Sequence, residues 1–137
     1  MKNLIILVFI CLVSIDTSWS HGVSNKASVF IISPLNGSNV TSPVRIKFGI
    51  KHFLIAPAGE NIHKAGHYHL LIDLDSDLSM DAPIPYTEKY LHFDNGETEV
   101  LLPLPTGQHT LQLVVGDEEH EPFEELVSEK ITITVIE

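Results

Sequence analysis

Cysteine is nearly absent from this chain of 137 residues, whose single cysteine, Cys11, lies in the apolar stretch at its start. A domain that begins after that stretch contains no disulfide, so apolar burial and well-formed turns must stabilise it. Basic residues are also scarce, because 8 Lys and Arg stand against 18 Asp and Glu, for a formal net charge of −10. This imbalance argues against binding to nucleic acid or to anionic membranes, and it favours cations.

Long apolar runs are confined to the beginning of the chain. Lys2 precedes an almost unbroken apolar run over residues 4–13, and Ser18 and Ser20 are small residues of the kind that a signal peptidase reads. The run is too short for a good transmembrane helix. We therefore expect a signal peptide over residues 1–20, a periplasmic or secreted protein without stable membrane insertion after cleavage, and a single domain over residues 21–137.

The remainder of the chain has no convincing amphipathic helix and instead alternates apolar with polar residues in short segments, which is typical of half-buried strands. Turn residues such as Asn-Gly and Pro separate these segments. Strands are predicted near residues 28–33, 43–50, 67–75, 90–93, 98–104, 109–115 and 131–136, with loops over residues 76–88 and over the acidic residues 116–125. About seven such strands predict an all-β, immunoglobulin-like β-sandwich, with a partly open barrel as the alternative.

The same alternation predicts which side chains form the core. One face of each central strand is apolar, so these faces should meet between the two sheets. The expected core residues are Tyr68, Leu70, Ile72, Leu74, Val44, Ile46, Phe48, Leu111, Leu113 and Ile133.

The segment Gly66–Asp75 carries the most specific pattern. Tyr68, Leu70, Ile72 and Leu74 are apolar, whereas the alternate positions, which include His67 and His69, are mostly polar. On a strand the two histidines project from the same face, close enough for both imidazoles to bind one metal ion. The alternative is a pair of exposed histidines on a solvated face.

Further ligands could complete such a site. His92 and His120, and less strongly Asp117, lie in segments bounded by turn residues and so near the ends of strands. In a sandwich, strand ends and loops converge at one end of the molecule. Three imidazoles with a carboxylate or water suit zinc or copper(II). Alternatively, the histidines donate hydrogen bonds to loop carbonyls and hold the connections in place.

His21 is a separate candidate. Cleavage after Ser20 would make His21 the first residue, which would offer its free amine and a ring nitrogen to copper(II). This arrangement is similar to the N-terminal histidine of exported copper chaperones and lytic polysaccharide monooxygenases. The alternative is a histidine that merely follows a cleavage site on a frayed terminus.

Several short motifs occur in an order that resembles a mostly bacterial exported family, domain of unknown function 4399. They are Phe30-Ile31-Ile32-Ser33-Pro34, Ser42-Pro43-Val44, Ala56-Pro57-Ala58-Gly59, the run from Gly66 to Asp73, Leu91-His92-Phe93 and His109-Thr110-Leu111-Gln112-Leu113. The resemblance extends from about Val29 to Val135, and its most specific motif is Gly-His-His-His-Leu-Leu-Ile-Asp. Here Tyr68 replaces the middle histidine and Tyr90 replaces another, while His67, His69, His92 and His120 are kept. The resemblance implies a fold and an exported location but no activity.

The sequence offers little support for nucleophilic catalysis, because it has no Gly-x-Ser-x-Gly motif and no cysteine after residue 20. We therefore expect a non-enzymatic binding module whose partner is a metal ion, copper or zinc, or a periplasmic protein. An adhesion or scaffold domain that recognises a protein or a wall component is the alternative. A copper-dependent oxidative enzyme built on His21 is the third hypothesis.

Overall fold

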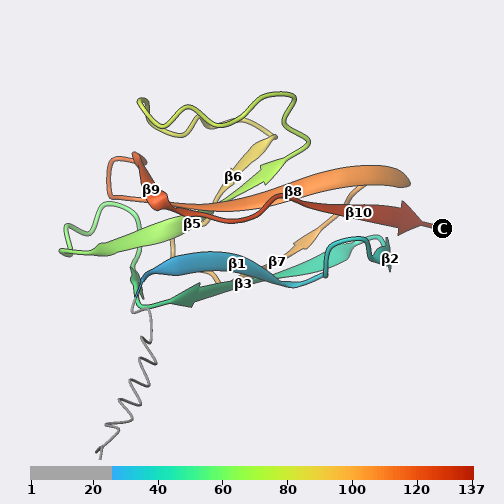
Figure 1. Cartoon of the computed structure of the whole chain (residues 1–137), viewed down its shortest axis with the longest axis horizontal. Helices are drawn as coiled ribbons and strands as arrows, with labels where there is room; N and C mark the ends of the chain where they lie inside the picture. The colour runs from blue at the N-terminus through green and yellow to red at the C-terminus, as the bar shows by residue number, and fades with distance from the viewer. Residues whose placement is uncertain (1–25) are drawn as a thin grey trace, which may run out of the picture.

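The computed structural model describes residues 26–137, and within that range the chain forms ten β-strands and no helix. The strands make two sheets that lie one above the other (Figure 1). The smaller sheet has the order β1 (Ser28–Ser33), β3 (Val44–Lys51), β7 (Glu99–Leu102). The larger sheet has the order β2 (Asn39–Thr41), β10 (Ile131–Ile136), β8 (Gly107–Gly116), β5 (Ala65–Ile72), β4 (Leu54–Ile55). Two more strands belong to it: β6 (Tyr90–His92) pairs with β5, and β9 (Pro122–Val127) pairs with β8. The predicted β-sandwich is confirmed.

All seven predicted strands are present, and three short ones were not foreseen. These are β2, β4 and β9. The prediction of a loop over residues 116–125 is wrong for its last part, because β9 begins at Pro122 and pairs with β8. Its acidic residues hide the strand, since Glu124 and Glu125 are both exposed and only Leu126 is fully buried.

The core between the sheets is built from the predicted faces. The side chains that pack there include those of Val44, Ile46, Phe48, Tyr68, Leu70, Ile72, Leu111, Leu113 and Ile133. Leu74 is the exception. It lies beyond the end of β5, is only half-buried, and packs in a second cluster around Leu71, Ile84 and Val114.

The second cluster explains why β5 differs from the half-buried strand that was predicted. All eight residues of β5 are buried, including the polar face. The segment that joins β5 to β6 crosses the outer face of the larger sheet (Figure 1, top), where Ile84 is 1% exposed. The backbone N–H of Ile84 donates to the carbonyl of His120 over 2.9 Å, and this hydrogen bond connects the segment to the β8–β9 loop. β5 is therefore covered on both faces.

The end of β5 is fixed by a polar contact. Asp73 has a positive φ of 50°, and its carboxylate accepts hydrogen bonds from the backbone N–H of Thr110 and from Nδ1 of His109, each over 2.7 Å. Nε2 of His109 donates to the carbonyl of Pro105 over 2.9 Å. Burial of this ring opposes its charged form, but the Asp73 carboxylate and the Pro105 carbonyl outweigh burial and raise the pKa of His109.

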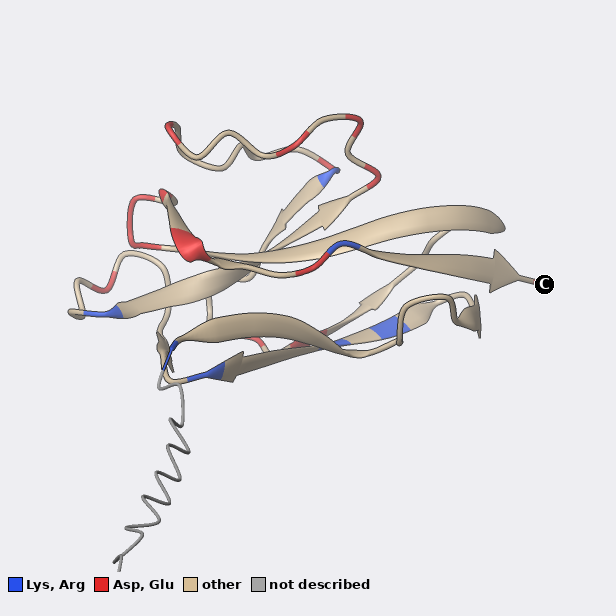
Figure 2. Ribbon diagram, in the orientation of Figure 1, with Lys and Arg blue, Asp and Glu red and all other residues tan. Residues whose placement is uncertain are grey.

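Across residues 26–137, no helix is long and apolar enough to span a membrane. Charged residues are unevenly spread over the two layers (Figure 2). Basic residues lie on β3, where Arg45 forms an ion pair with Glu99 of β7. Acidic residues gather in the β5–β6 connection and around the β8–β9 loop, on the side of the larger sheet that faces away from the core.

Replacement of Ile72 by Ala should lower the free energy of unfolding by about 2–5 kcal/mol, because it removes buried apolar contacts and leaves a cavity. Leu101→Ala is the control, since Leu101 is 51% exposed and its truncation should change the free energy by no more than about 0.5 kcal/mol. Urea unfolding measures both. Equal effects of the two substitutions would contradict the assignment of Ile72 to the core.

The His109–Asp73 contact predicts a pH dependence. The folded chain holds the His109 proton more tightly than the unfolded chain, so the extra stability is present below the unfolded pKa of about 6.5 and is lost as the pH rises through the folded pKa. The difference in unfolding free energy between the wild type and His109→Gln should therefore be larger at pH 5.5 than at pH 8.5. A difference that grows with pH would contradict this assignment.

Candidate metal centre

Four histidines meet on the outer face of β5. His67 and His69 lie on the same face of that strand, as the alternation predicted. The antiparallel pairing of β5 with β6 places His92 directly opposite His69, and His120 reaches the same place from the β8–β9 loop. Each ring offers one nitrogen to the group, and these nitrogens all lie within 4.8 Å of one another. The four histidines that the sequence put forward are thus brought together.

The rings pack directly against one another. The centroid of the His69 ring is 4.5 Å from that of His67, 4.4 Å from that of His92 and 5.6 Å from that of His120. His120 in turn lies 4.7 Å from His67 and 5.0 Å from His92. Four nitrogens bound tetrahedrally to one zinc ion at 2.0–2.1 Å would lie about 3.3 Å apart. The observed nitrogens all lie within 4.8 Å of one another, an upper bound that is wider than this spacing.

Five of the eight ring nitrogens in this group are buried without hydrogen-bond partners among the described residues. His67 is 1% and His69 0% exposed, and neither ring nitrogen of either residue is hydrogen-bonded. Nδ1 of His92 is also buried and forms no hydrogen bond. An unsatisfied buried donor or acceptor costs about 1–3 kcal/mol, and native proteins contain few of them. These unpaired nitrogens belong to three neighbouring rings, each of which could offer one nitrogen to a shared ion.

The electrostatics keep these rings neutral. Burial lowers the pKa of His69 to about 2, helped by the neighbouring His67, His92 and His120. Burial also lowers the pKa of His67, with a further contribution from His120, and it is the main reason why the pKa of His92 is lowered. A neutral imidazole has a free lone pair, so at pH 7 these three histidines are in the form that a metal ion requires.

The surroundings orient the rings. Nε2 of His92 donates to the carbonyl of Pro85 over 2.8 Å, which leaves Nδ1 with its lone pair directed toward the other histidines. Gly116 makes room for His69, because a Cβ atom at that position would lie 2.8 Å from Cε1 of the ring. A side chain at Gly116 would therefore displace the most deeply buried histidine of the group.

His120 is held in a backbone conformation that is uncommon for a residue with a side chain. Its φ is +65°, which costs roughly 1–3 kcal/mol and persists only where the surroundings impose it. Asp117 supplies that constraint. Its Oδ1 accepts hydrogen bonds from the backbone N–H groups of Glu119 and Glu121, each over 2.9 Å. The Asp117 carboxylate lies outside the group of four ligand atoms, and it shapes the loop that presents His120.

Two further side chains at this site were not anticipated from the sequence. Oδ1 of Asp94 is buried and unpaired, and it lies 3.6 Å from Nε2 of His67, 3.5 Å from Nε2 of His120 and 4.0 Å from Nδ1 of His92. Tyr86 stacks on His92 at 3.6 Å between ring centroids, and its hydroxyl is 2.5 Å from Nε2 of His120.

Neither residue was indicated by a strand pattern in the sequence. β6 ends at His92, and Asp94 lies in the turn that follows, where the N–H of Gly96 donates to the carbonyl of Phe93 over 3.1 Å. The Asp94-Asn95-Gly96 pattern predicts this turn but does not show what the Asp94 carboxylate faces. Tyr86 lies in an irregular segment, and no periodicity in the sequence connects it to the site.

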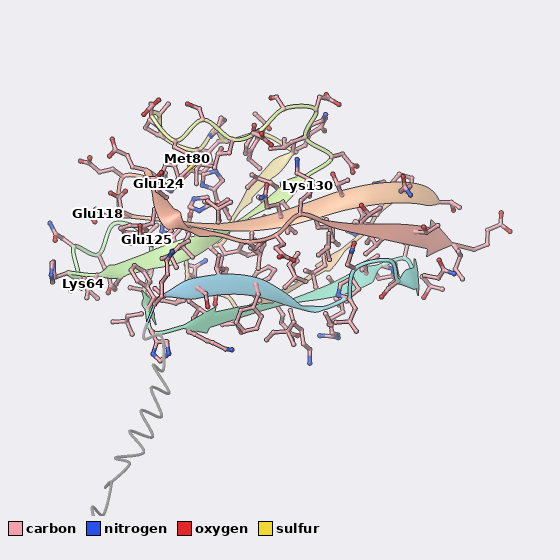
Figure 3. All side chains as sticks on the ribbon, viewed as in Figure 1. Lys64, Met80, Glu118, Glu124, Glu125 and Lys130 are labelled. Carbon is pink, nitrogen blue, oxygen red and sulfur yellow. The ribbon has the colours of Figure 1, made fainter. Side chains whose placement is uncertain are left out.

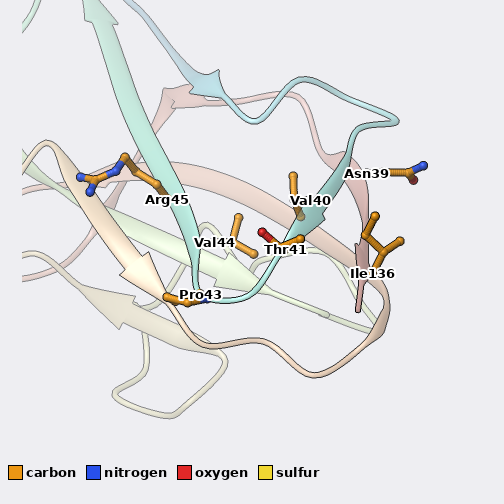
Figure 4. Close-up of a pocket in the computed structure, with 7 residues that line it drawn as sticks. All are labelled: Asn39, Val40, Thr41, Pro43, Val44, Arg45 and Ile136. Atoms are coloured by element: carbon orange, nitrogen blue, oxygen red, sulfur yellow. The ribbon is translucent and has the colours of Figure 1, made fainter.

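His21, the remaining candidate, is outside the described residues. Two histidines that were not proposed as ligands, His52 and His63, are exposed. A cavity of about 420 Å³ is lined by Asn39, Val40, Thr41, Pro43, Val44, Arg45 and Ile136 (Figure 4). It borders β2 and the end of β10, far along the sandwich from β9, and no histidine, cysteine or carboxylate lines it.

The charge around the histidines favours a cation. Glu118, Glu124 and Glu125 gather at the end of the sandwich where the β8–β9 loop lies, with Met80 of the β5–β6 connection drawn above them (Figure 3). Fixed negative charge near a cleft raises the local concentration of cations and speeds their association. The acidic loops therefore complement a site in which burial lowers the pKa of His67, His69 and His92 and so keeps these three rings uncharged.

Comparisons with known proteins agree with the family suggested by the sequence motifs. No curated protein and no solved structure matches the chain. A family described as "Domain of unknown function (DUF4399)" matches residues 46–136. This range runs from β3 to β10 and includes all four histidines and Asp94. The match covers more than half of the chain, and the chain belongs to the DUF4399 family.

Proposed function

We propose that this protein is an exported, non-enzymatic binding module that holds one transition-metal ion, zinc or copper, between His67, His69, His92 and His120. The observation that carries the proposal is that three neighbouring rings, those of His67, His69 and His92, hold five buried nitrogens without a hydrogen bond, and that one nitrogen of each can reach a common point. Without an ion, these groups have lost their contact with water and gained no hydrogen bond. An ion would satisfy the ligand nitrogens at once and so stabilise the folded chain.

The donor set decides the class of ion. Imidazole suits zinc, copper, iron and nickel, whereas calcium and magnesium prefer sites made of oxygen. Thiolate ligands are not available, since the only cysteine is Cys11. Among divalent first-row ions, copper(II) should bind most tightly, and zinc should bind less tightly than copper(II), as the general order of affinities requires.

The structure also suggests how an ion is enclosed. Tyr86 is 66% exposed and covers the rings of His92 and His120 from the solvent side. A ring nitrogen has one lone pair, so an ion on Nε2 of His120 would replace the hydrogen bond from the Tyr86 hydroxyl. Tyrosine fluorescence is therefore a suitable reporter of loading, with Tyr86→Phe as its control.

Titration of the metal-free protein with zinc should give one strong site per chain. His67→Ala and His92→Ala should each weaken zinc binding by at least about 100-fold, and the double variant should be little worse than either single one, because each removes a ligand from the same ion. His63→Ala is the matched control, since His63 is exposed, and it should bind zinc as the wild type does.

Competition with a chelator and isothermal titration calorimetry measure these affinities. Binding that survives in the double variant would assign the ion to another site. If the wild type binds no ion at all, the histidines are structural and the scaffold hypothesis, in which the loops recognise a protein or wall component, takes the place of this proposal.

The lowered pKa values predict that binding tolerates mild acid. Four histidines with ordinary pKa values near 6.5 would lose affinity by about 10⁴-fold at pH 5.5, because each would be mostly protonated. Here the pKa values of His67, His69 and His92 lie lower, so protons compete less at that pH. The loss in zinc affinity between pH 7.5 and pH 5.5 should be well below that factor. A loss as large as for free imidazoles would contradict the neutral, buried state of these rings.

A further inference from the structure

Asp94 faces the histidines with a carboxylate oxygen, Oδ1, that is buried and forms no hydrogen bond, and the Tyr86 hydroxyl interacts with the same carboxylate group. Oδ1 is buried although the side chain as a whole is 42% exposed, so the carboxylate directs one oxygen inward. That oxygen lies 3.5–4.0 Å from nitrogens of His67, His92 and His120. These three distances approach the separations expected between neighbouring ligands of a single ion, although Asp94 is not one of the four residues whose ligand atoms all lie within 4.8 Å of one another.

The backbone around Asp94 is firmly placed. Phe93 is 6% exposed, packs on Phe48 at 4.7 Å between ring centroids, and donates its N–H to the carbonyl of Tyr68 over 3.0 Å. The carbonyl of Asp94 accepts a hydrogen bond from the N–H of Ala58 over 2.8 Å. The core and these two backbone hydrogen bonds therefore fix the position of the backbone from which the Asp94 side chain extends.

We propose that Asp94 is a fifth ligand of the metal centre and supplies its negative charge, so that the site takes a divalent first-row ion, zinc(II) or copper(II), and not copper(I). This inference rests on the proposed function and specifies which ions the site accepts.

Charge and ligand type both support this assignment. Four neutral imidazoles leave the full charge of a divalent ion uncompensated in a buried place, and one carboxylate reduces the net charge from +2 to +1. Copper(I) needs less compensation and prefers soft sulfur ligands, whereas a carboxylate oxygen suits the harder divalent ions. A carboxylate at this point therefore adds affinity for zinc(II) and copper(II) and adds little for copper(I).

The test compares Asp94→Ala and Asp94→Asn with a matched control, Glu119→Gln. Glu119 is exposed and adjacent to His120, so its replacement removes one negative charge near the site without removing a ligand. Affinities for zinc(II) and for copper(I) are measured by chelator competition, the latter under reducing conditions. Thermal unfolding of each metal-free variant verifies that it is folded.

Asp94→Ala should weaken zinc(II) binding by at least tenfold and leave copper(I) binding within about twofold of the wild type, while Glu119→Gln should change neither. Cobalt(II) adds a readout on the wild type itself. Its visible absorption should have the lower intensity of a five-coordinate ion, and it should rise toward that of a tetrahedral ion in Asp94→Ala.

Three results would overturn the inference while leaving the proposed function intact. They are zinc(II) binding unchanged in Asp94→Ala, an equal loss in Asp94→Ala and Glu119→Gln, and an equal loss of zinc(II) and copper(I). A wild type that binds none of these ions overturns the proposed function itself, so the two failures are distinguishable.

Discussion

The burial of β5 on both faces is the constraint on which the rest of the structure depends. The strand is paired along both edges, with β8 on one side and with β4 and β6 on the other. One face packs into the core through Tyr68 and Leu70, and the other face carries His67 and His69, which are 1% and 0% exposed. A strand in this position gives its side chains no water, so every polar atom on it must find a partner inside the protein.

The neighbouring elements are arranged around that requirement. The β5–β6 register sets His92 opposite His69, and the glycine at position 116 leaves space for the His69 ring. The β8–β9 loop holds His120 in a strained conformation, and the β5–β6 connection covers the site with Tyr86. Strain of this kind, together with unpaired buried nitrogens, lowers the stability of the empty fold. Such costs are commonly concentrated at functional sites, where a bound group offsets them.

His109 shows what a structural histidine looks like in this fold. Both of its ring nitrogens are hydrogen-bonded, to the Asp73 carboxylate and to the Pro105 carbonyl, and its pKa is raised. His67 and His69 have the opposite environment, with unpaired nitrogens and a lowered pKa. If the histidines only supported loops, their ring nitrogens should be hydrogen-bonded to loop groups. His109 and Nε2 of His92 meet this expectation. The ring nitrogens of His67 and His69 do not, because none of them forms a hydrogen bond to a loop carbonyl.

The local pattern of the sequence was sufficient for the strands that alternate cleanly and for the shared face of His67 and His69. It was insufficient wherever a distant segment decides the environment. The burial of β5 depends on Ile84, which is twelve residues beyond the end of that strand. β9 was missed because two exposed glutamates dominate its composition. Asp94 lies in the turn that follows β6, and a turn pattern in the sequence does not show what its carboxylate faces. The periodicity of a strand gives the direction of a side chain, but the tertiary contacts alone show what it faces. A group of side chains assembled from three separate segments is therefore only partly visible in the sequence, and the carboxylate of Asp94 is the part that was hidden.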